Sequence, residues 1–278
     1  MPAPPTAPTR VGPQGGDPRA RGASVRVDLS TCVCRYGPPP PALAAARGVS
    51  AEALRAHPYG AVDQLLEAYG RYLGVPAGDL VAGRGVSELV WQLAAGPLGE
   101  RVVVPVPAYT EFRQAFPGAA VGAPGVHHPL GVIAEALGSG AVVLVANPHN
   151  PSGRAFGAQE LAAVAAAHPQ GVLVVDESYV EFCADPATFS LVGAHLANLV
   201  VLRSPSKFFG LAGCRVGVAW SPVPALRRGV DRPRGSWPVS ALEVAPAAAA
   251  LADTAWASAT RAQLVEDGAW LDRQVGPL

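Results

Sequence analysis

The chain has 278 residues, half of them hydrophobic and only 15% charged, so it is long and apolar enough to bury a large core. Lys plus Arg and Asp plus Glu both number 21, and this balance, without a basic stripe, argues against a nucleic-acid partner. No hydrophobic run approaches the ~20 residues of a membrane-spanning helix, so no membrane partner is expected.

The N-terminal stretch, residues 1–24, is rich in Pro and Gly and lacks the hydrophobic centre of a signal peptide. We expect it to be a disordered tail. Cys32 and Cys34 are close in sequence, but neither a second cysteine pair nor a nearby histidine completes a metal site. With Cys183 and Cys214 they are expected to be reduced thiols of a cytoplasmic protein without a metal.

Short hydrophobic runs alternate with alanine-rich segments along the rest of the chain. This alternation predicts an α/β fold whose mostly parallel sheet is buried on both faces. The expected strands are Val25–Leu29, Val102–Val104, Ala141–Ala146, Val172–Val175 and Leu199–Leu202. The expected helices are Ala42–Arg47, Ala61–Leu73, Val86–Ala95 and Leu161–Ala167, followed by a helical segment from Ser240 to Gln274.

Polar residues follow three of these strands where each one ends. Asn150 comes after the strand that ends at Ala146, Asp176 and Tyr179 follow the next strand, and Lys207 follows the third. The carboxyl ends of parallel strands meet at one edge of a sheet, which is where open α/β folds bind ligands. The sequence therefore predicts a crevice lined by an amide, a carboxylate, a phenol and an amine.

Lys207 lies among Phe, Gly, Leu and Ala, with no carboxylate nearby in sequence. Such surroundings lower the pKa of a lysine and make its amine nucleophilic, which suits a Schiff base with a carbonyl cofactor. Ser204 and Ser206 precede it and Arg215 follows, and these three side chains could hold a phosphate. A solvated lysine in a polar turn is the alternative reading.

Six motifs occur in one order over roughly residues 25–275. They are Arg35–Pro39, Gly83–Leu89, Pro105–Tyr109, Asn147–Gly153, Val175–Phe182 and Ser204–Gly217. Together they resemble the class I and II aminotransferases of fold type I, which depend on pyridoxal 5'-phosphate (PLP), and in particular histidinol-phosphate aminotransferases and threonine-phosphate decarboxylases. The resemblance implies a three-layer α/β/α sandwich with a mostly parallel central sheet. It also implies a homodimer with a shared active site that acts on an amino acid or its phosphorylated derivative and on a 2-oxo acid.

The resemblance assigns a role to each polar residue at the strand ends. Lys207 would form the internal aldimine and move protons at the substrate's α-carbon, and Asp176 would pair with the pyridinium nitrogen. Tyr179 and Asn150 would donate to the ring's phenolic oxygen, and Tyr109 would stack on the ring. The plainer alternatives are a helix cap for Asp176, a turn residue for Asn150, and core packing for the two tyrosines.

The phosphate would lie at a helix start. Val86 and Ser87 begin a helix after two glycines, where free N–H groups and the helix dipole favour an anion. By resemblance, Ser204, Ser206 and Arg215 complete this phosphate site.

The family also brings a tyrosine from the neighbouring subunit to the phosphate. In this chain His57 occupies the aligned position, and Tyr59 lies two residues further on. We favour Tyr59 for this role, with simple packing as the alternative. Arg35, Arg84 and Arg113 are further cations near the cofactor motifs, and each would bind substrate or be solvated or paired elsewhere.

By resemblance, residues 25–240 form the PLP-binding large domain, and residues 241–278 lead to a small domain that is expected to be absent or truncated. In the family that domain supplies an arginine for the substrate carboxylate. Three functions therefore stay open: an aminotransferase, a PLP-dependent decarboxylase or cyclase, and a catalytically silent partner subunit with this fold.

Overall fold

The structure is a computed structural model that describes residue 26 and residues 29–97, 101–122, 130–232 and 235–276. The chain divides into two units, Met1–Val33 and Cys34–Leu278, and the fold below belongs to the second. The expected tail over residues 1–24 lies outside the described residues. So does most of the strand expected at Val25–Leu29, and its described members Arg26 and Leu29 are not in a strand.

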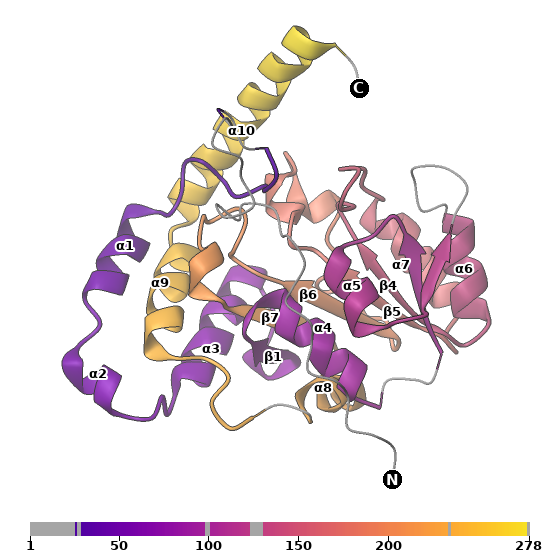
Figure 1. Ribbon diagram of the computed structural model, residues 1–278, viewed down its shortest axis with the longest axis horizontal. Coiled ribbons are helices and arrows are strands. Elements are labelled where there is room, and N and C mark those ends of the chain that lie inside the picture. Colours follow the sequence, from indigo (N-terminus) through magenta and orange to yellow (C-terminus); the bar gives the residue numbers. More distant parts are fainter. Residues whose placement is uncertain (1–25, 27–28, 98–100, 123–129, 233–234, 277–278) are drawn as a thin grey trace. The chain divides into compact units, whose positions relative to one another are not determined.

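A seven-stranded sheet forms the centre of the described part of the chain, in the order β1-β7-β6-β5-β4-β2-β3 (Figure 1). β7 runs antiparallel to both of its neighbours, and all other neighbouring pairs are parallel. The strands are β1 (Leu80–Gly83), β2 (Val102–Val106), β3 (Ala120–Gly122), β4 (Val142–Ala146), β5 (Val172–Asp176), β6 (Leu199–Arg203) and β7 (Gly217–Trp220). The prediction of a mostly parallel sheet is confirmed.

Helices cover both faces of this sheet, as Figure 1 shows. They are α1 (Pro40–Arg47), α2 (Ala51–Arg55), α3 (Ala61–Leu73), α4 (Gly85–Ala95), α5 (Thr110–Ala115), α6 (Leu130–Gly138), α7 (Ala158–Ala167), α8 (Pro224–Asp231), α9 (Ala241–Ala252) and α10 (Thr254–Val275). The side chains of β1, β2, β4, β5, β6 and β7 alternate between two hydrophobic cores. Val143 and Val145 join α3, α6, α7 and α9 in one core, and Val142 and Leu144 join α4, α5 and α8 in the other. The architecture is therefore the expected three-layer α/β/α sandwich.

The helical segment expected over Ser240–Gln274 is two helices rather than one. Asp253 separates α9 from α10, and its carboxylate accepts a hydrogen bond from the backbone N–H of Trp256 at 3.0 Å, which caps the second helix. One face of the first turns of α10 is buried, at Ala257 and Thr260, and the Trp256 ring stacks on Phe209 at 5.8 Å between centroids. Further along, Trp270 is 57% exposed.

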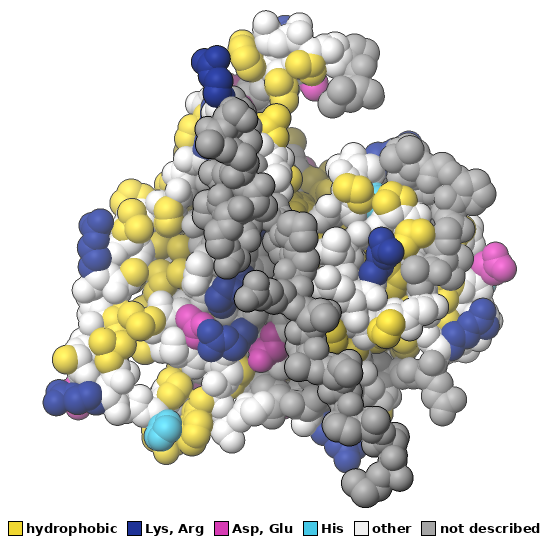
Figure 2. Space-filling view, in the orientation of Figure 1, with side chains coloured by type: hydrophobic (Ala, Val, Ile, Leu, Met, Phe, Trp, Pro, Cys, Tyr) yellow, Lys and Arg dark blue, Asp and Glu magenta, His cyan; other side chains and the backbone are white. Residues whose placement is uncertain are grey.

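Hydrophobic side chains are also exposed over α1, α2 and α9, where Figure 2 shows them in yellow. They include Leu43, Leu54 and Leu242, together with Tyr59 and Trp237 from the neighbouring loops. The His57 ring stacks on Trp237 at 4.2 Å, and Tyr59 meets Trp237 edge-on at 6.0 Å. Among the described residues, no helix is long and apolar enough to cross a membrane.

Candidate active site

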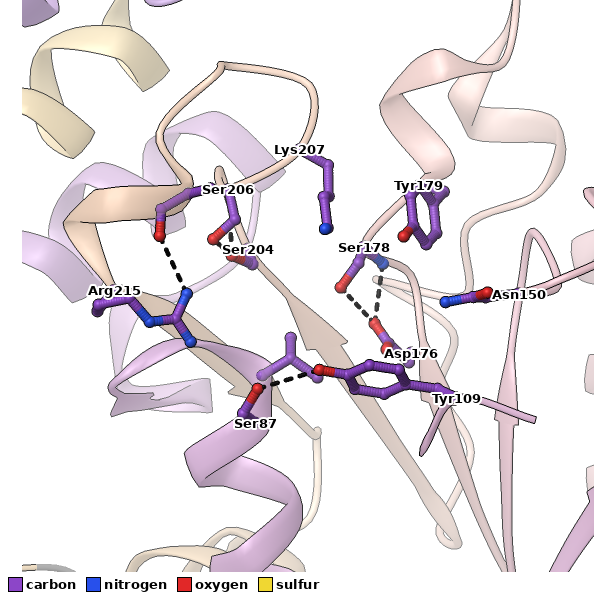
Figure 3. Close-up of a pocket in the computed structure, with 12 residues that line it drawn as sticks. Ser87, Tyr109, Asn150, Asp176, Ser178, Tyr179, Ser204, Ser206, Lys207 and Arg215 are labelled. Atoms are coloured by element: carbon purple, nitrogen blue, oxygen red, sulfur yellow. Dashed lines mark hydrogen bonds between the residues drawn. The ribbon is translucent and has the colours of Figure 1, made fainter. Parts of the chain in front are cut away.

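A cavity of about 160 Å³ opens at the carboxyl ends of β4, β5 and β6, beside the start of α4 (Figure 3). Ten of the eleven predicted site residues line it. They are Val86, Ser87, Tyr109, Asn150, Asp176, Tyr179, Ser204, Ser206, Lys207 and Arg215. Ser178 and Ala212 complete the lining. Four of the predicted residues, Asn150, Asp176, Tyr179 and Lys207, were grouped by the strand-end argument, and parallel strands do deliver their carboxyl ends to the same edge.

Asp176 supplies a buried carboxylate at the end of β5. Its Oδ1 accepts hydrogen bonds from the Ser178 backbone N–H at 2.9 Å and from the Ser178 hydroxyl at 2.5 Å. Burial raises the pKa of Asp176, while the Ser178 hydrogen bonds and the charge of Lys207 lower it in part. A buried carboxylate of this kind gains most from a cationic partner placed in the cavity.

Lys207 enters the cavity from the turn after β6, and its side chain is half-buried. Its backbone carbonyl accepts hydrogen bonds from the N–H of Cys34 at 2.9 Å and of Gly210 at 3.3 Å. Its Nζ lies 6.0 Å from the centre of the Tyr179 ring. Figure 3 shows the amine between the two serines of its own turn and the segment that carries Ser178 and Tyr179.

The end of the cavity away from Asn150 has the features of an anion-binding site (Figure 3). The first turn of α4 presents its backbone N–H groups there, beside Ser204, Ser206 and Arg215. The two serine hydroxyls lie 2.6 Å apart, and Arg215 Nη1 donates to the Ala212 carbonyl at 3.1 Å. Arg215 has φ +48°, a left-handed conformation that is costly for a residue with a Cβ and is found most often at functional sites.

Tyr109 and Asn150 form the remaining wall. The Tyr109 hydroxyl lies 3.2 Å from Ser87 Oγ, and burial raises the pKa of Tyr109, so its phenol keeps its proton. Asn150 follows His149, whose Nε2 lies 2.9 Å from the Pro107 carbonyl oxygen. This contact joins the loop of Asn150 to the loop of Tyr109.

These residues fit pyridoxal phosphate. The carboxylate of Asp176 matches a cationic ring nitrogen, the amine of Lys207 matches a carbonyl carbon, and the helix start with Arg215 matches a phosphate. The three features lie in one cavity, and they are complementary to the three reactive parts of this cofactor.

Tyr59 is the predicted residue that the structure does not bring to the cavity. It is 79% exposed and packs against Trp237, so a role at the phosphate would require a second copy of the chain. Ser178 was missed by the sequence analysis, although a serine two residues after an aspartate is a recognisable signal, because it can donate both its N–H and its hydroxyl back to that carboxylate.

Two of the three additional arginines are paired with carboxylates. Arg35 lies 3.0 Å from Asp267, and Arg84 lies 2.7 Å from Glu243. Arg113 is exposed on α5.

Comparison with known proteins identifies the family of the chain. The sequence model of the family "Aminotransferase class I and II" matches residues 25–268. Histidinol-phosphate aminotransferase 1 of Trichormus variabilis is 32% identical over 265 residues, which cover 91% of this chain and 74% of the relative.

Two solved structures share the fold. Histidinol-phosphate aminotransferase from Sinorhizobium meliloti, in complex with pyridoxal-5'-phosphate, aligns with a TM-score of 0.78 and 26% identity over 87% of this chain and 68% of that chain. L-threonine-O-3-phosphate decarboxylase from Porphyromonas gingivalis aligns with a TM-score of 0.72 and 22% identity over 82% of this chain and 70% of that chain.

The fold and the cavity together define a pyridoxal-phosphate-dependent transferase. The chain belongs to the class I and II aminotransferase family. It spans between 68% and 74% of the length of the two histidinol-phosphate aminotransferases described above.

Gly85 provides a test of the anion-binding end. It has φ +74°, and a Cβ added there would lie 2.7 Å from Arg215 Nη2. Gly85→Ala therefore fits only if the guanidinium moves away. We expect its PLP dissociation constant to rise about 10- to 100-fold, the value of one hydrogen bond to a charged group.

Gly193→Ala is the matched control for this substitution. Gly193 has φ +88°, but a Cβ there would meet nothing within 4 Å. It should cost about 1–2 kcal/mol of stability through backbone strain alone and leave PLP affinity unchanged. Fluorescence titration with PLP and thermal unfolding of both variants make the comparison. Equal PLP affinities in the two variants would contradict the placement of the phosphate beside Arg215.

Proposed function

We propose that this protein is an aminotransferase that moves an amino group between a phosphorylated amino compound and a 2-oxo acid. The observation that carries the proposal is the presence of a lysine amine, a buried carboxylate and an anion-binding helix start in one cavity. The similarity to histidinol-phosphate aminotransferase 1 supports a substrate of that class. When bound, pyridoxal phosphate supplies the electron sink that makes bonds at the α-carbon of an amino acid breakable.

The residues of the cavity would bind the cofactor and move the substrate's proton. Lys207 Nζ would bind the cofactor covalently and then take a proton from the substrate's α-carbon and return it during the exchange. Asp176 would hold a proton on the ring nitrogen, and Tyr179 and Asn150 would donate hydrogen bonds to the ring's oxygen.

The anion-binding end fixes the cofactor in place. The first N–H groups of α4, at Val86 and Ser87, would bind the phosphate together with Ser204, Ser206 and Arg215. These contacts are remote from the bonds that change, so they supply orientation rather than chemistry.

A homodimer with a shared active site is part of this proposal. Exposed hydrophobic side chains over α1, α2 and α9 offer a surface for a second copy (Figure 2). Tyr59 stands on this surface beside Trp237 and would reach the phosphate of the partner's site. We also propose that residues 25–240 act as the cofactor-binding domain, that α9 packs into its core, and that α10 leads out of it.

The test is an amino-transfer assay with an isotope label. Purified protein loaded with PLP is incubated with ¹⁵N-labelled histidinol phosphate and 2-oxoglutarate, and the products are analysed by mass spectrometry. We expect the label to appear in glutamate, because an aminotransferase moves the donor's amino nitrogen to the 2-oxo acid. Release of CO2 in a parallel incubation with an amino acid in place of histidinol phosphate would instead identify a decarboxylase. PLP binding without turnover of any amino donor would indicate a silent subunit.

A further inference from the structure

A second cluster of charged side chains lies beside the cofactor cavity without lining it. Its centre is Arg203, the last residue of β6, which is only 5% exposed. Arg203 Nη1 donates to Glu177 Oε2 at 2.7 Å, and Nη2 donates to Glu181 Oε1. A single guanidinium thus binds two carboxylates that lie four residues apart in the chain.

The surroundings of this cluster satisfy its polar atoms. Glu177 also accepts hydrogen bonds from the Leu191 N–H at 2.6 Å and the Ser190 hydroxyl at 2.7 Å, and the Tyr72 hydroxyl donates to Glu181 at 3.0 Å. Burial raises the pKa of Glu177, while Arg203 and these hydrogen bonds lower it in part. Buried charges are costly unless paired, so the two carboxylates depend on the guanidinium.

The cluster is linked to the cavity by the alternation of side chains at the strand ends. Asp176 and Ser204 line the cavity, whereas their chain neighbours Glu177 and Arg203 contact each other and do not line it. Adjacent residues at the carboxyl ends of β5 and β6 therefore belong to two different sites. A shift of the buried pair would displace Asp176 and Ser204, because each is the chain neighbour of one member of the pair.

Between Glu177 and Glu181 the chain forms a short arch that contains Ser178 and Tyr179. A 3₁₀ turn at Val180–Phe182 continues it, with the Val180 N–H bonded to the Glu177 carbonyl at 3.2 Å. Arg203 holds both ends of this arch. It also begins the segment that runs through Ser204 and Ser206 to Lys207.

We infer that Arg203 is a positioning residue that sets the place of Asp176 and Tyr179 relative to Lys207 by binding Glu177 and Glu181 at the same time. This inference rests on the proposed function of the cavity. It requires the two-pronged shape of a guanidinium, because a lysine ammonium in its place keeps the charge but cannot span both carboxylates in the same planar geometry.

Arg203→Lys is the discriminating variant, because it keeps a buried cation. In the cofactor-free protein we expect faster hydrogen exchange in peptides covering residues 177–183. With PLP we expect a dissociation constant about tenfold higher and a changed induced circular dichroism of the bound cofactor, since small displacements at such a site are costly. Glu181→Gln frees one end of the arch and serves as a second test if Arg203→Lys does not fold.

Asn198→Ala is the matched control at the other end of the same strand. The Asn198 side chain donates to the carbonyls of Ala165, His168 and Gly171, and none of these residues lines the cavity. Its loss should lower thermal stability without changing PLP affinity or the cofactor's circular dichroism.

The inference is overturned if Arg203→Lys and Glu181→Gln behave as Asn198→Ala does, with lower stability and an unchanged cofactor signal. Failure of the cofactor assignment, on which the inference rests, is a separate result. In that case the wild-type protein and Asn198→Ala would also fail to bind PLP.

Discussion

Lys207→Ala is expected to abolish amino transfer while leaving the protein folded. The Lys207 side chain is half-buried, and its turn is held by backbone contacts to Cys34 and Gly210 that an alanine keeps. The variant loses both the nucleophile and the group that moves the α-proton. The proton-transfer role alone is worth about 10²–10⁴-fold in kcat, and the loss of the covalent bond adds to this.

A second measurement on Lys207→Ala distinguishes covalent from non-covalent binding of PLP. After borohydride treatment, peptide mass spectrometry of the wild type should find the reduced cofactor on Lys207, and no peptide of Lys207→Ala should carry it. Lys207→Arg is the control, because it retains a cation but not a nucleophilic amine. The variants should still bind PLP reversibly through the anion-binding end. Wild-type levels of amino transfer in Lys207→Ala would refute the assignment.

Asp176→Asn is expected to stabilise the cofactor-free protein and to disable the enzyme. Burial raises the pKa of Asp176 from its ordinary value of 3.8. Because the folded state then holds this proton to higher pH than the unfolded state, the carboxyl costs stability as pH rises through the raised pKa. Asparagine removes the charge and can still accept both Ser178 hydrogen bonds. We expect a gain on the order of 1–3 kcal/mol at neutral pH.

The effect on activity has the opposite sign. A neutral amide cannot hold a proton on the ring nitrogen, so we expect kcat to fall on the order of 10²–10³-fold, the typical cost of removing one preorganised electrostatic contact. Thermal unfolding across the pH range tests the first effect, and the advantage of Asp176→Asn should vanish below the ordinary pKa of aspartate. A variant less stable than the wild type at every pH would show that the buried charge is already compensated without the cofactor.

Much of the fold was predictable because its central strands are continuous hydrophobic runs. β4, β5 and β6 are buried on both faces, and the expected helix at Ala61–Leu73 has the same bounds in the structure. β1 and β7 were missed, since each has only four residues and a glycine at one end. Such short segments leave too few residues for a periodic pattern.

The cavity residues were predictable for a topological reason, whereas Arg203 was not. Parallel strand ends share an edge, so Asn150, Asp176 and Lys207 could be grouped from sequence alone. The pairing of Arg203 with Glu177 depends on the register of β5 against β6, in which Asp176 lies opposite Leu202. Nothing local in the sequence shows that register.

The alternation at the ends of β5 and β6 fixes which side chains face the cavity and which face the cluster around Arg203. Removal or insertion of one residue within either strand would exchange the roles of neighbours, so that Glu177 or Arg203 would point into the cavity and Asp176 or Ser204 away from it. Substitutions can be absorbed one position at a time, but a change of length alters both sites together. Among proteins that share this arrangement, differences in chain length should therefore fall outside these strands and the arch between Glu177 and Glu181.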